Sequence, residues 1–334
     1  MYQHTPKYNV SMMLGKYMPI HYGHIYAIET ARALSKKVYV LVYTMKREPI
    51  PGILRYEALK KHFANDPIVE VKWIEKDIPQ YPEEHPDFWN IWKKDVMEQV
   101  GEKIDCIFGS EDYVKTLSEH VGCNHYTVDI SRSIVPISGT DCRRIPLHEW
   151  HYIIPEIRSH FTKKICFVGG ESTGKTTLAR MFAKIYQTNY VEEFGREYCL
   201  TNPPSKFNTG DFSHIARMQH NNEKAALPFS NKLLFCDTDA IVTQCFHILY
   251  LKERSRDLDN LIRKNNYDHY FLLAPCIDFE DDGTREFAQK RGEQFLLLKD
   301  ELQKANSVFT VIETADMHQR IQQIKDVIEG LWLL

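Results

Sequence analysis

The chain has 334 residues, of which 43% are hydrophobic and 26% charged, and its formal net charge is −3. This length favours two domains, each large enough to bury its own core. A near-neutral charge without long runs of one sign argues against nucleic-acid or membrane binding, and the longest apolar runs are too short to span a bilayer.

The start of the chain lacks the apolar core of a secretory signal. The eight cysteines show neither a Cys-x-x-Cys pair nor the spacing of a zinc site. We therefore expect a cytoplasmic protein.

The predicted elements of the first half alternate between strand and helix, which is typical of parallel sheets with crossover helices, and the second half restarts with a strand, a loop and a helix. In the first half, strands are expected at 9–14, 37–43, 68–74, 104–108 and 125–129, and helices at 24–34, 54–63, 88–100, 113–121 and from about 141. In the second half, strands are expected at 164–168, 233–236, 270–273 and 308–312, and helices at 175–186 and 317–331. The segment 148–162 is too apolar for a flexible linker, so we expect a packed connector between domains 1–147 and 163–334.

A first motif for binding phosphate lies near the amino terminus, where the predicted strand leads into Gly15-Lys16-Tyr17-Met18-Pro19-Ile20-His21-Tyr22-Gly23-His24. His21 and His24 are three residues apart at a helix start and so face one side, and Gly23 permits close approach of a phosphate. Imidazoles together with the amides of a helix N-terminus suit a polyphosphate. Two histidines alone are weak support, because core or surface histidines are common.

A partner segment, Ile137-Ser138-Gly139-Thr140-Asp141-Cys142-Arg143, follows more than a hundred residues later. Ser138 and Thr140 can cap a helix and bind phosphate, while Arg143 faces the same anion from the first turn.

A second phosphate motif lies at the middle of the chain and matches the P-loop pattern Gly-x-x-x-x-Gly-Lys-Thr. The glycines let backbone N–H groups face the β-phosphate. Lys175 reaches the β- and γ-phosphates, and the Thr176 hydroxyl can complete a Mg²⁺ shell. The residues expected to bind phosphate here are Gly169, Gly170, Glu171, Ser172, Thr173, Gly174, Thr176 and Thr177.

Carboxylates in the second half of the chain indicate which reaction the P-loop serves. Asp237 ends an apolar strand, as expected of a group that reaches Mg²⁺ directly or through water. Asp239 is a second candidate, for the acceptor, unless it is only a helix N-cap. Glu193 can take the proton of an acceptor hydroxyl and Arg196 can bind the acceptor, although a solvated charge cluster would look the same.

Two arginines late in the chain, Arg285 and Arg291, are candidates for a lid that neutralises charge in the transition state. Ordinary surface arginines are the alternative. Together these parts favour a kinase that phosphorylates a small hydroxyl compound.

The first motif and its partner segment resemble the His-x-Gly-His nucleotidyltransferase superfamily, including its lead-in at Gly15, Tyr17 and Pro19. The resemblance implies a Rossmann-like domain in which a substrate phosphate attacks the α-phosphate of a nucleoside triphosphate and expels pyrophosphate. It places His21 and His24 on the triphosphate. The residues assisting them would be Lys16, Ser138, Thr140 and Arg143.

The two halves in this order resemble the bifunctional NadR family over nearly the whole chain. Further matches are Tyr81-Pro82, Trp89, Asp129 with Arg132, Trp150, Pro155, Glu193 to Glu197, Asp237 to Asp239 and Val242 to Gln244. The resemblance implies an α/β protein with a nucleotidyltransferase domain followed by a P-loop kinase domain. The kinase would convert nicotinamide riboside to NMN, and the amino-terminal domain would join NMN to AMP, giving NAD.

ATP is the expected substrate of both reactions, and Mg²⁺ the expected cofactor. Trp73 or Trp89 could stack on the cationic nicotinamide ring, although either suits core packing as well. About ten residues precede the first strand, too few for the helix-turn-helix module of bacterial relatives, so repressor activity is not expected.

Two other functions remain open. The same folds could serve other substrates, as another nucleotidyltransferase fused to a nucleoside kinase. A non-catalytic sensor of NAD or ATP is also possible, although it would not need to retain His21, His24, Lys175 and Thr176. We expect small-molecule partners only; the sequence leaves a homo-oligomer open.

Overall fold

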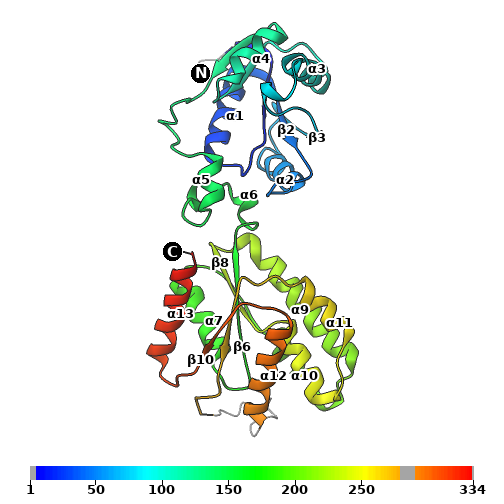
Figure 1. Ribbon diagram of the computed structural model, residues 1–334, viewed down its shortest axis with the longest axis vertical. Helices are drawn as coiled ribbons and strands as arrows, with labels where there is room; N and C mark the ends of the chain where they lie inside the picture. Colours follow the sequence, from blue (N-terminus) through cyan, green and yellow to red (C-terminus); the bar gives the residue numbers. More distant parts are fainter. Residues whose placement is uncertain (1–4, 279–289, 333–334) are drawn as a thin grey trace. The chain divides into compact units, whose positions relative to one another are not determined.

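The computed structural model describes residues 5–278 and 290–332. The chain divides into two compact units, Met1–Arg158 and Ser159–Leu334, and the division falls within the segment 148–162. Each unit is built on a five-stranded sheet whose paired strands are all parallel (Figure 1). This confirms the predicted α/β class with two tandem parallel sheets.

The sheet of the first unit has the strand order β3-β2-β1-β4-β5. Its central strands are almost entirely buried, as expected where helices cover both faces. Helices α3 and α4 pack Trp92, Val96 and Leu117 onto one face, and right-handed crossovers place α1 and α2 on the other. The strands are β1 Tyr8–Gly15, β2 Ser35–Thr44, β3 Val69–Glu75, β4 Cys106–Gly109 and β5 Asn124–Thr127; the helices are α1 Tyr22–Leu34, α2 Gly52–His62, α3 Phe88–Val100, α4 Tyr113–Val121, α5 Gly139–Arg144 and α6 Pro155–Arg158, with 3₁₀ turns η1 Pro82–Glu84 and η2 Trp150–Tyr152.

The sheet of the second unit has the order β10-β9-β6-β8-β7. Helices α7 and α13 cover one face, α10 and α12 cover the other, and α9 and α11 pack with α10 in a further cluster. The strands are β6 Lys163–Gly169, β7 Tyr190–Val191, β8 Leu233–Asp237, β9 His269–Leu273 and β10 Phe309–Ile312; the helices are α7 Lys175–Ile185, α8 Phe194–Cys199, α9 Thr209–Ala226, α10 Ala240–Leu251, α11 Arg256–Lys264, α12 Arg291–Lys304 and α13 Met317–Trp332, with 3₁₀ turns η3 Pro204–Lys206 and η4 Leu227–Phe229.

Both phosphate motifs follow the middle strand of their sheet. The first follows β1, which lies between β2 and β4, and the second follows β6, which lies between β9 and β8. In open parallel sheets ligands bind at the carboxyl ends of the strands, where the chain order reverses. Each motif therefore occupies the position where its sheet favours a ligand.

Candidate active sites

In the first unit the two histidines of the motif lie one above the other at the start of α1. His21 is the N-cap residue of α1, and its backbone N–H donates to Nδ1 of His24 over 3.3 Å. The two rings are stacked with centroids 3.8 Å apart, and the buried Tyr17 ring meets His24 edge-on. The stack fixes both imidazoles at the helix N-terminus, where an anion is favoured.

Burial keeps both imidazoles neutral. It lowers the pKa of His21 to about 4, and the nearby Arg132 guanidinium acts in the same direction. The pKa of His24 also lies well below its usual value, first because of burial and then because of His21 and Arg132. At neutral pH the rings are therefore polar hydrogen-bonding groups, ready to gain positive charge beside an anion.

The partner segment meets the first motif through Arg143. Ser138 is the N-cap of α5, and its hydroxyl accepts from the Asp141 N–H over 3.1 Å. Arg143 donates to the Met18 carbonyl and, over 3.0 Å, to the hydroxyl of Thr140. A Cβ at Gly139 would lie 2.9 Å from the Met18 carbonyl oxygen, so only glycine permits this approach. The structure thus brings together two segments more than a hundred residues apart.

Lys16 is held by a buried acid and arginine that the sequence did not indicate. Its Nζ lies 3.6 Å from Glu48 Oε1. Glu48 also pairs with Arg55, which is fully buried and donates to the Lys16 carbonyl. Arg132, which the sequence analysis named with Asp129 only as a family match, acts on both histidines from a turn in which Asp129 accepts the backbone N–H groups of Ser133 and Val135.

The two tryptophans proposed for nicotinamide lie in different surroundings. Trp73 lies near the carboxyl end of β3. Its ring stacks on Tyr56, and its indole N–H donates to the Thr44 hydroxyl. The residue is 42% exposed. Trp89 packs against the core cluster of α3 and α4 and stacks on His120. Exposure leaves Trp73 as the more accessible aromatic surface.

In the second unit the P-loop wraps around the space at the end of β6. Lys175 donates to the Gly170 carbonyl over 3.0 Å, and the Thr173 hydroxyl donates to the same oxygen over 2.9 Å. Gly174 has a φ of +90°, a left-handed conformation that glycine adopts without strain. Thr177 is exposed in the first turn of α7.

A hydroxyl and a carboxylate meet beside this loop. The Thr176 hydroxyl donates to Asp237 Oδ2 over 2.5 Å, because β6 and β8 are neighbours and Phe167 pairs with Asp237. Asp237 Oδ1 is buried without a hydrogen-bond partner, and burial raises the pKa of this carboxyl. The described residues contain no group of three or more His, Cys, Asp or Glu side chains suited to a metal. Mg²⁺ needs fewer protein ligands when substrate phosphates supply the rest, so Thr176 and Asp237 fit it.

A cleft opens beside Lys175. Glu193, the N-cap residue of α8, lies on it with Arg196, whose Nε is 4.0 Å from Glu193 Oε2. Burial raises the pKa of Glu193, against the opposing effect of Lys175. The far walls are aromatic and come from η3, α9 and α10, which the sequence did not predict; the side chains are Phe207, Phe212, Phe246 and Tyr250.

Asp239 is placed as the N-cap of α10. Its Oδ1 accepts from the N–H groups of Ile241 and Val242 over 2.9 and 3.3 Å, and its Oδ2 accepts from the Tyr270 hydroxyl over 2.9 Å. It is fully buried and does not line the cleft. The structure therefore shows a capping role for Asp239.

The first residues of α12 make hydrogen bonds to the P-loop. Arg291 donates to the carbonyls of Ser172 and Ile277 over 3.0 and 2.9 Å. Gln294, which the sequence did not indicate, accepts from the Glu171 N–H over 3.2 Å. Arg285 lies outside the described residues.

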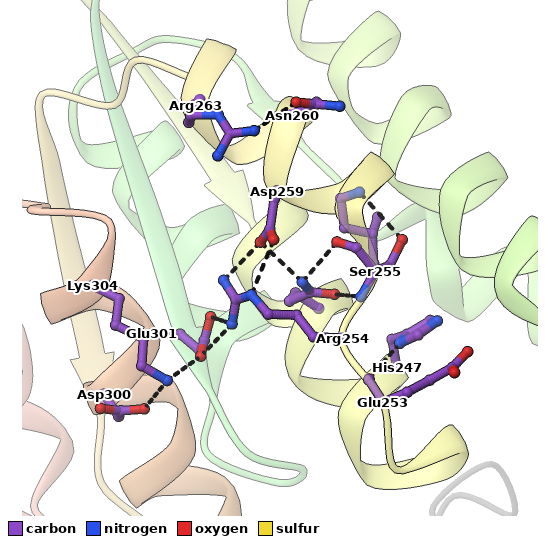
Figure 2. Close-up of polar contacts among 12 residues, drawn as sticks. His247, Glu253, Arg254, Ser255, Asp259, Asn260, Arg263, Asp300, Glu301 and Lys304 are labelled. Atoms are coloured by element: carbon purple, nitrogen blue, oxygen red, sulfur yellow. Dashed lines mark hydrogen bonds and ion pairs between the residues drawn. The ribbon is translucent and has the colours of Figure 1, made fainter.

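The carboxyl end of α12 is fixed by an ion network (Figure 2). Arg254, from the segment between α10 and α11, donates to both oxygens of Glu301 over 2.7 Å and to Asp259 over 3.0 Å. Lys304 joins Glu301 to Asp300 in the same group. Since Glu301 is buried, the pairing orients α12 firmly against the wall of the cleft.

Comparisons with known proteins give a separate family match for each of the two units. Residues 12–145 match the Cytidylyltransferase-like family and residues 164–320 match the AAA domain family. The "Trifunctional NAD biosynthesis/regulator protein NadR" of Escherichia coli (strain K12) is 27% identical over 97% of this chain and 84% of its own length. The protein of the same name from Salmonella typhimurium is 26% identical over 97% of this chain and 83% of its own length.

Solved structures show the same fold. A crystal structure of NadR protein in complex with NR aligns with a TM-score of 0.82 and 20% identity, covering 98% of this chain and 97% of that one. A second, of NadR protein in complex with NAD and AMP-PNP, gives a TM-score of 0.80 at 20% identity over 97% of both chains. The described residues contain no helix that is both long and apolar enough to cross a membrane. The chain is a homologue of the NadR proteins, and its cytidylyltransferase-like domain is followed by a P-loop domain.

Proposed function

We propose that this chain is a bifunctional transferase of NAD salvage, a ribosylnicotinamide kinase and a nicotinamide-nucleotide adenylyltransferase in one polypeptide. The relatives named for NAD biosynthesis, and solved structures of the same fold that hold NR, NAD and an ATP analogue, support these substrates. The observation that carries the proposal is the cleft in which Lys175 and Glu193 face an aromatic-walled space.

In the kinase step, Lys175 and the P-loop amides hold the donor phosphates while the acceptor lies in the cleft. Glu193 accepts the proton of the 5′-hydroxyl as the hydroxyl attacks the γ-phosphate; its raised pKa makes it a better base. Arg196 steadies the acceptor beside it. Bound Mg²⁺, held by Thr176 and Asp237, would neutralise charge on the phosphates. The aromatic walls suit a cationic nicotinamide ring.

In the adenylyltransferase step, the phosphate of NMN attacks the α-phosphate of ATP and pyrophosphate leaves. The neutral pair His21 and His24 donates hydrogen bonds to the triphosphate and stabilises the charge that develops on it. Arg143 and Lys16 add positive charge, and Ser138 and Thr140 present the amino end of α5. Trp73 provides an exposed surface for the nicotinamide ring.

The test supplies nicotinamide riboside and Mg-ATP and follows ADP, NMN, pyrophosphate and NAD separately. His21→Ala should abolish pyrophosphate and NAD formation and leave NMN formation intact. Lys175→Ala should abolish NMN formation and leave intact the conversion of supplied NMN to NAD. Each loss should reach at least about 10²-fold, the usual effect of removing a group that stabilises transition-state charge.

Controls are His125→Ala and Lys184→Ala, exposed residues in the same two units, which should keep both activities. If either His21→Ala or Lys175→Ala removed both activities from a folded chain, two separate sites would be ruled out. ADP formation with another nucleoside in place of nicotinamide riboside would redirect the proposal to that acceptor.

A further inference from the structure

A fully buried arginine lies beneath the P-loop. Arg320, in the first turn of α13, has no exposed surface. It donates to the carbonyl oxygens of Thr314 over 2.5 Å, Thr173 over 2.7 Å and Ala274 over 3.5 Å. These carbonyls belong to the segments that follow β10, β6 and β9. One planar guanidinium thus joins three neighbouring segments at the carboxyl edge of the sheet, a task for which its fork of donors is suited.

Its contact with the P-loop lies at the bend. Thr173 and Gly174 precede the first residue of α7, and a Cβ at Gly174 would lie 3.5 Å from Arg320 Nη1. Because the Thr173 carbonyl accepts from Arg320, this hydrogen bond fixes the orientation of the peptide group at the bend of the loop. A P-loop binds an anion through backbone amides, so its function depends on such orientations.

Among the described residues, Arg320 has no acidic partner within 4.0 Å. The acceptors of its hydrogen bonds are all neutral carbonyls. A buried cation is costly unless an opposite charge compensates it. The P-loop above it is built to receive a polyphosphate.

The first unit offers a comparison. Arg55 is also fully buried and also donates to a carbonyl of its phosphate loop, that of Lys16, but it is neutralised by Glu48. Arg55 thus has a buried acidic partner, whereas Arg320 has none among the described residues.

We propose that Arg320 is a positioning residue of the phosphate-donor site, which holds the P-loop in its anion-binding conformation and whose positive charge is compensated by the polyphosphate of the bound nucleotide. The role rests on the proposed kinase function for its substrate. It predicts an effect on the donor and not on the acceptor, because Arg320 does not line the cleft for the acceptor.

The experiment compares full-length Arg320→Met, Arg320→Lys and the matched control Lys325→Met, on the exposed side of the same helix. ADP formation reports the kinase alone, since the other reaction releases pyrophosphate. Arg320→Met should raise KM for ATP by about tenfold or more, the usual effect of losing charged hydrogen bonds. KM for nicotinamide riboside should stay within about twofold, and Arg320→Lys, which keeps charge but loses the fork, should fall between. An unchanged KM for ATP in Arg320→Met, or an equal rise for both substrates, would overturn the proposal.

A second measurement needs neither turnover nor acceptor. Mg-ADP should raise the melting temperature of the wild type, and the part of this rise that Lys175→Ala abolishes belongs to the P-loop. That part should shrink in Arg320→Lys and persist in Lys325→Met; its persistence in Arg320→Lys would contradict the role. If the wild type shows the Mg-ADP effect and phosphorylates no nucleoside, the proposed function fails while the role of Arg320 stands.

Discussion

At the scale of single residues, the two units stabilise their phosphate loops by different electrostatic means. The first unit packs two imidazoles that burial keeps neutral, and balances its buried Arg55 with Glu48. Within the described residues, the second unit leaves Arg320 without an acidic partner and buries Asp237 with one oxygen unbonded. Each unit also buries a polar atom that has no hydrogen-bond partner, His21 Nδ1 in the first and Asp237 Oδ1 in the second, and such atoms are candidates for contact with a ligand.

The neutral state of His21 predicts a pH-dependent stability. Its pKa is about 4 in the fold and about 6.5 in an unfolded chain. Between these values the unfolded state binds a proton that the folded state does not, so stability is full above pH 6.5 and falls as the pH drops towards 4. The loss between pH 7 and pH 4.5 is about 2.5 kcal/mol.

Urea unfolding of the wild type and of His21→Asn at both pH values checks this. Asparagine keeps an N-cap and cannot titrate, so the variant should lose less stability on acidification. An equal loss in both proteins would mean that His21 does not resist protonation in the fold.

Much of each site was readable because its residues are close in sequence. The P-loop, the His21–His24 pair and Asp237 follow strands that hydrophobic runs reveal. Arg320 was missed, although it shares the apolar stripe of Met317, Ile324 and Ile328 on the last helix. A charge on such a stripe indicates a buried cation, but the carbonyls that bind it come from three distant segments and cannot be read from one helix.

At the scale of elements, those anchored by continuous apolar runs were predicted to within a few residues; α3 and α4 match the expected 88–100 and 113–121. Helices α9, α10, α11 and α12 were not predicted. Their apolar residues face one another as well as the sheet, which blurs the single amphipathic face that marks a helix in sequence. Since α9 and α10 contribute to the far wall of the cleft, the sequence predicted only the side of the acceptor site that Lys175 and Glu193 form.

Asp239 caps α10 with a buried carboxyl group, and burial disfavours the charged form of that group. Burial raises the pKa of Asp239 to about 6. A carboxyl whose folded pKa exceeds its unfolded value stabilises the fold at low pH, and this contribution is lost as the pH rises through 6. Asparagine caps equally well without a charge, so Asp239→Asn should gain about 2 kcal/mol relative to the wild type between pH 4 and pH 8.

Denaturant unfolding at the two pH values measures the gain, with Asp239→Ala as the variant that loses the cap. The kinase KM for nicotinamide riboside should stay within about twofold in Asp239→Asn, because the side chain does not line the cleft. A large rise in this KM with unchanged stability would instead return Asp239 to the acceptor site.

At the scale of the whole molecule, each unit has its own sheet and its own hydrophobic clusters. The proposed reactions are consecutive, since NMN made by the second unit is the substrate of the first. Nothing in this scheme requires the two reactions to share a residue.

Separate expression of residues 1–158 and 159–334 should therefore give two folded proteins. The first should convert NMN to NAD, and the second should phosphorylate nicotinamide riboside, each with kcat/KM comparable to that of the full chain. Cooperative thermal unfolding and the two product assays check this. A fragment that is folded but inactive would show that its site needs residues from the other half.

The cysteines have a practical consequence. Burial raises the thiol pKa to about 11 in Cys106 and about 12 in Cys142, and holds it well above its ordinary value in Cys166, Cys236 and Cys245. Of the eight, Cys276 is the one that is exposed, and it lies next to Ile277, the neighbour of Gly174 in the P-loop. A maleimide dye should attach there first, giving the unmutated chain a fluorescent reporter beside the nucleotide loop.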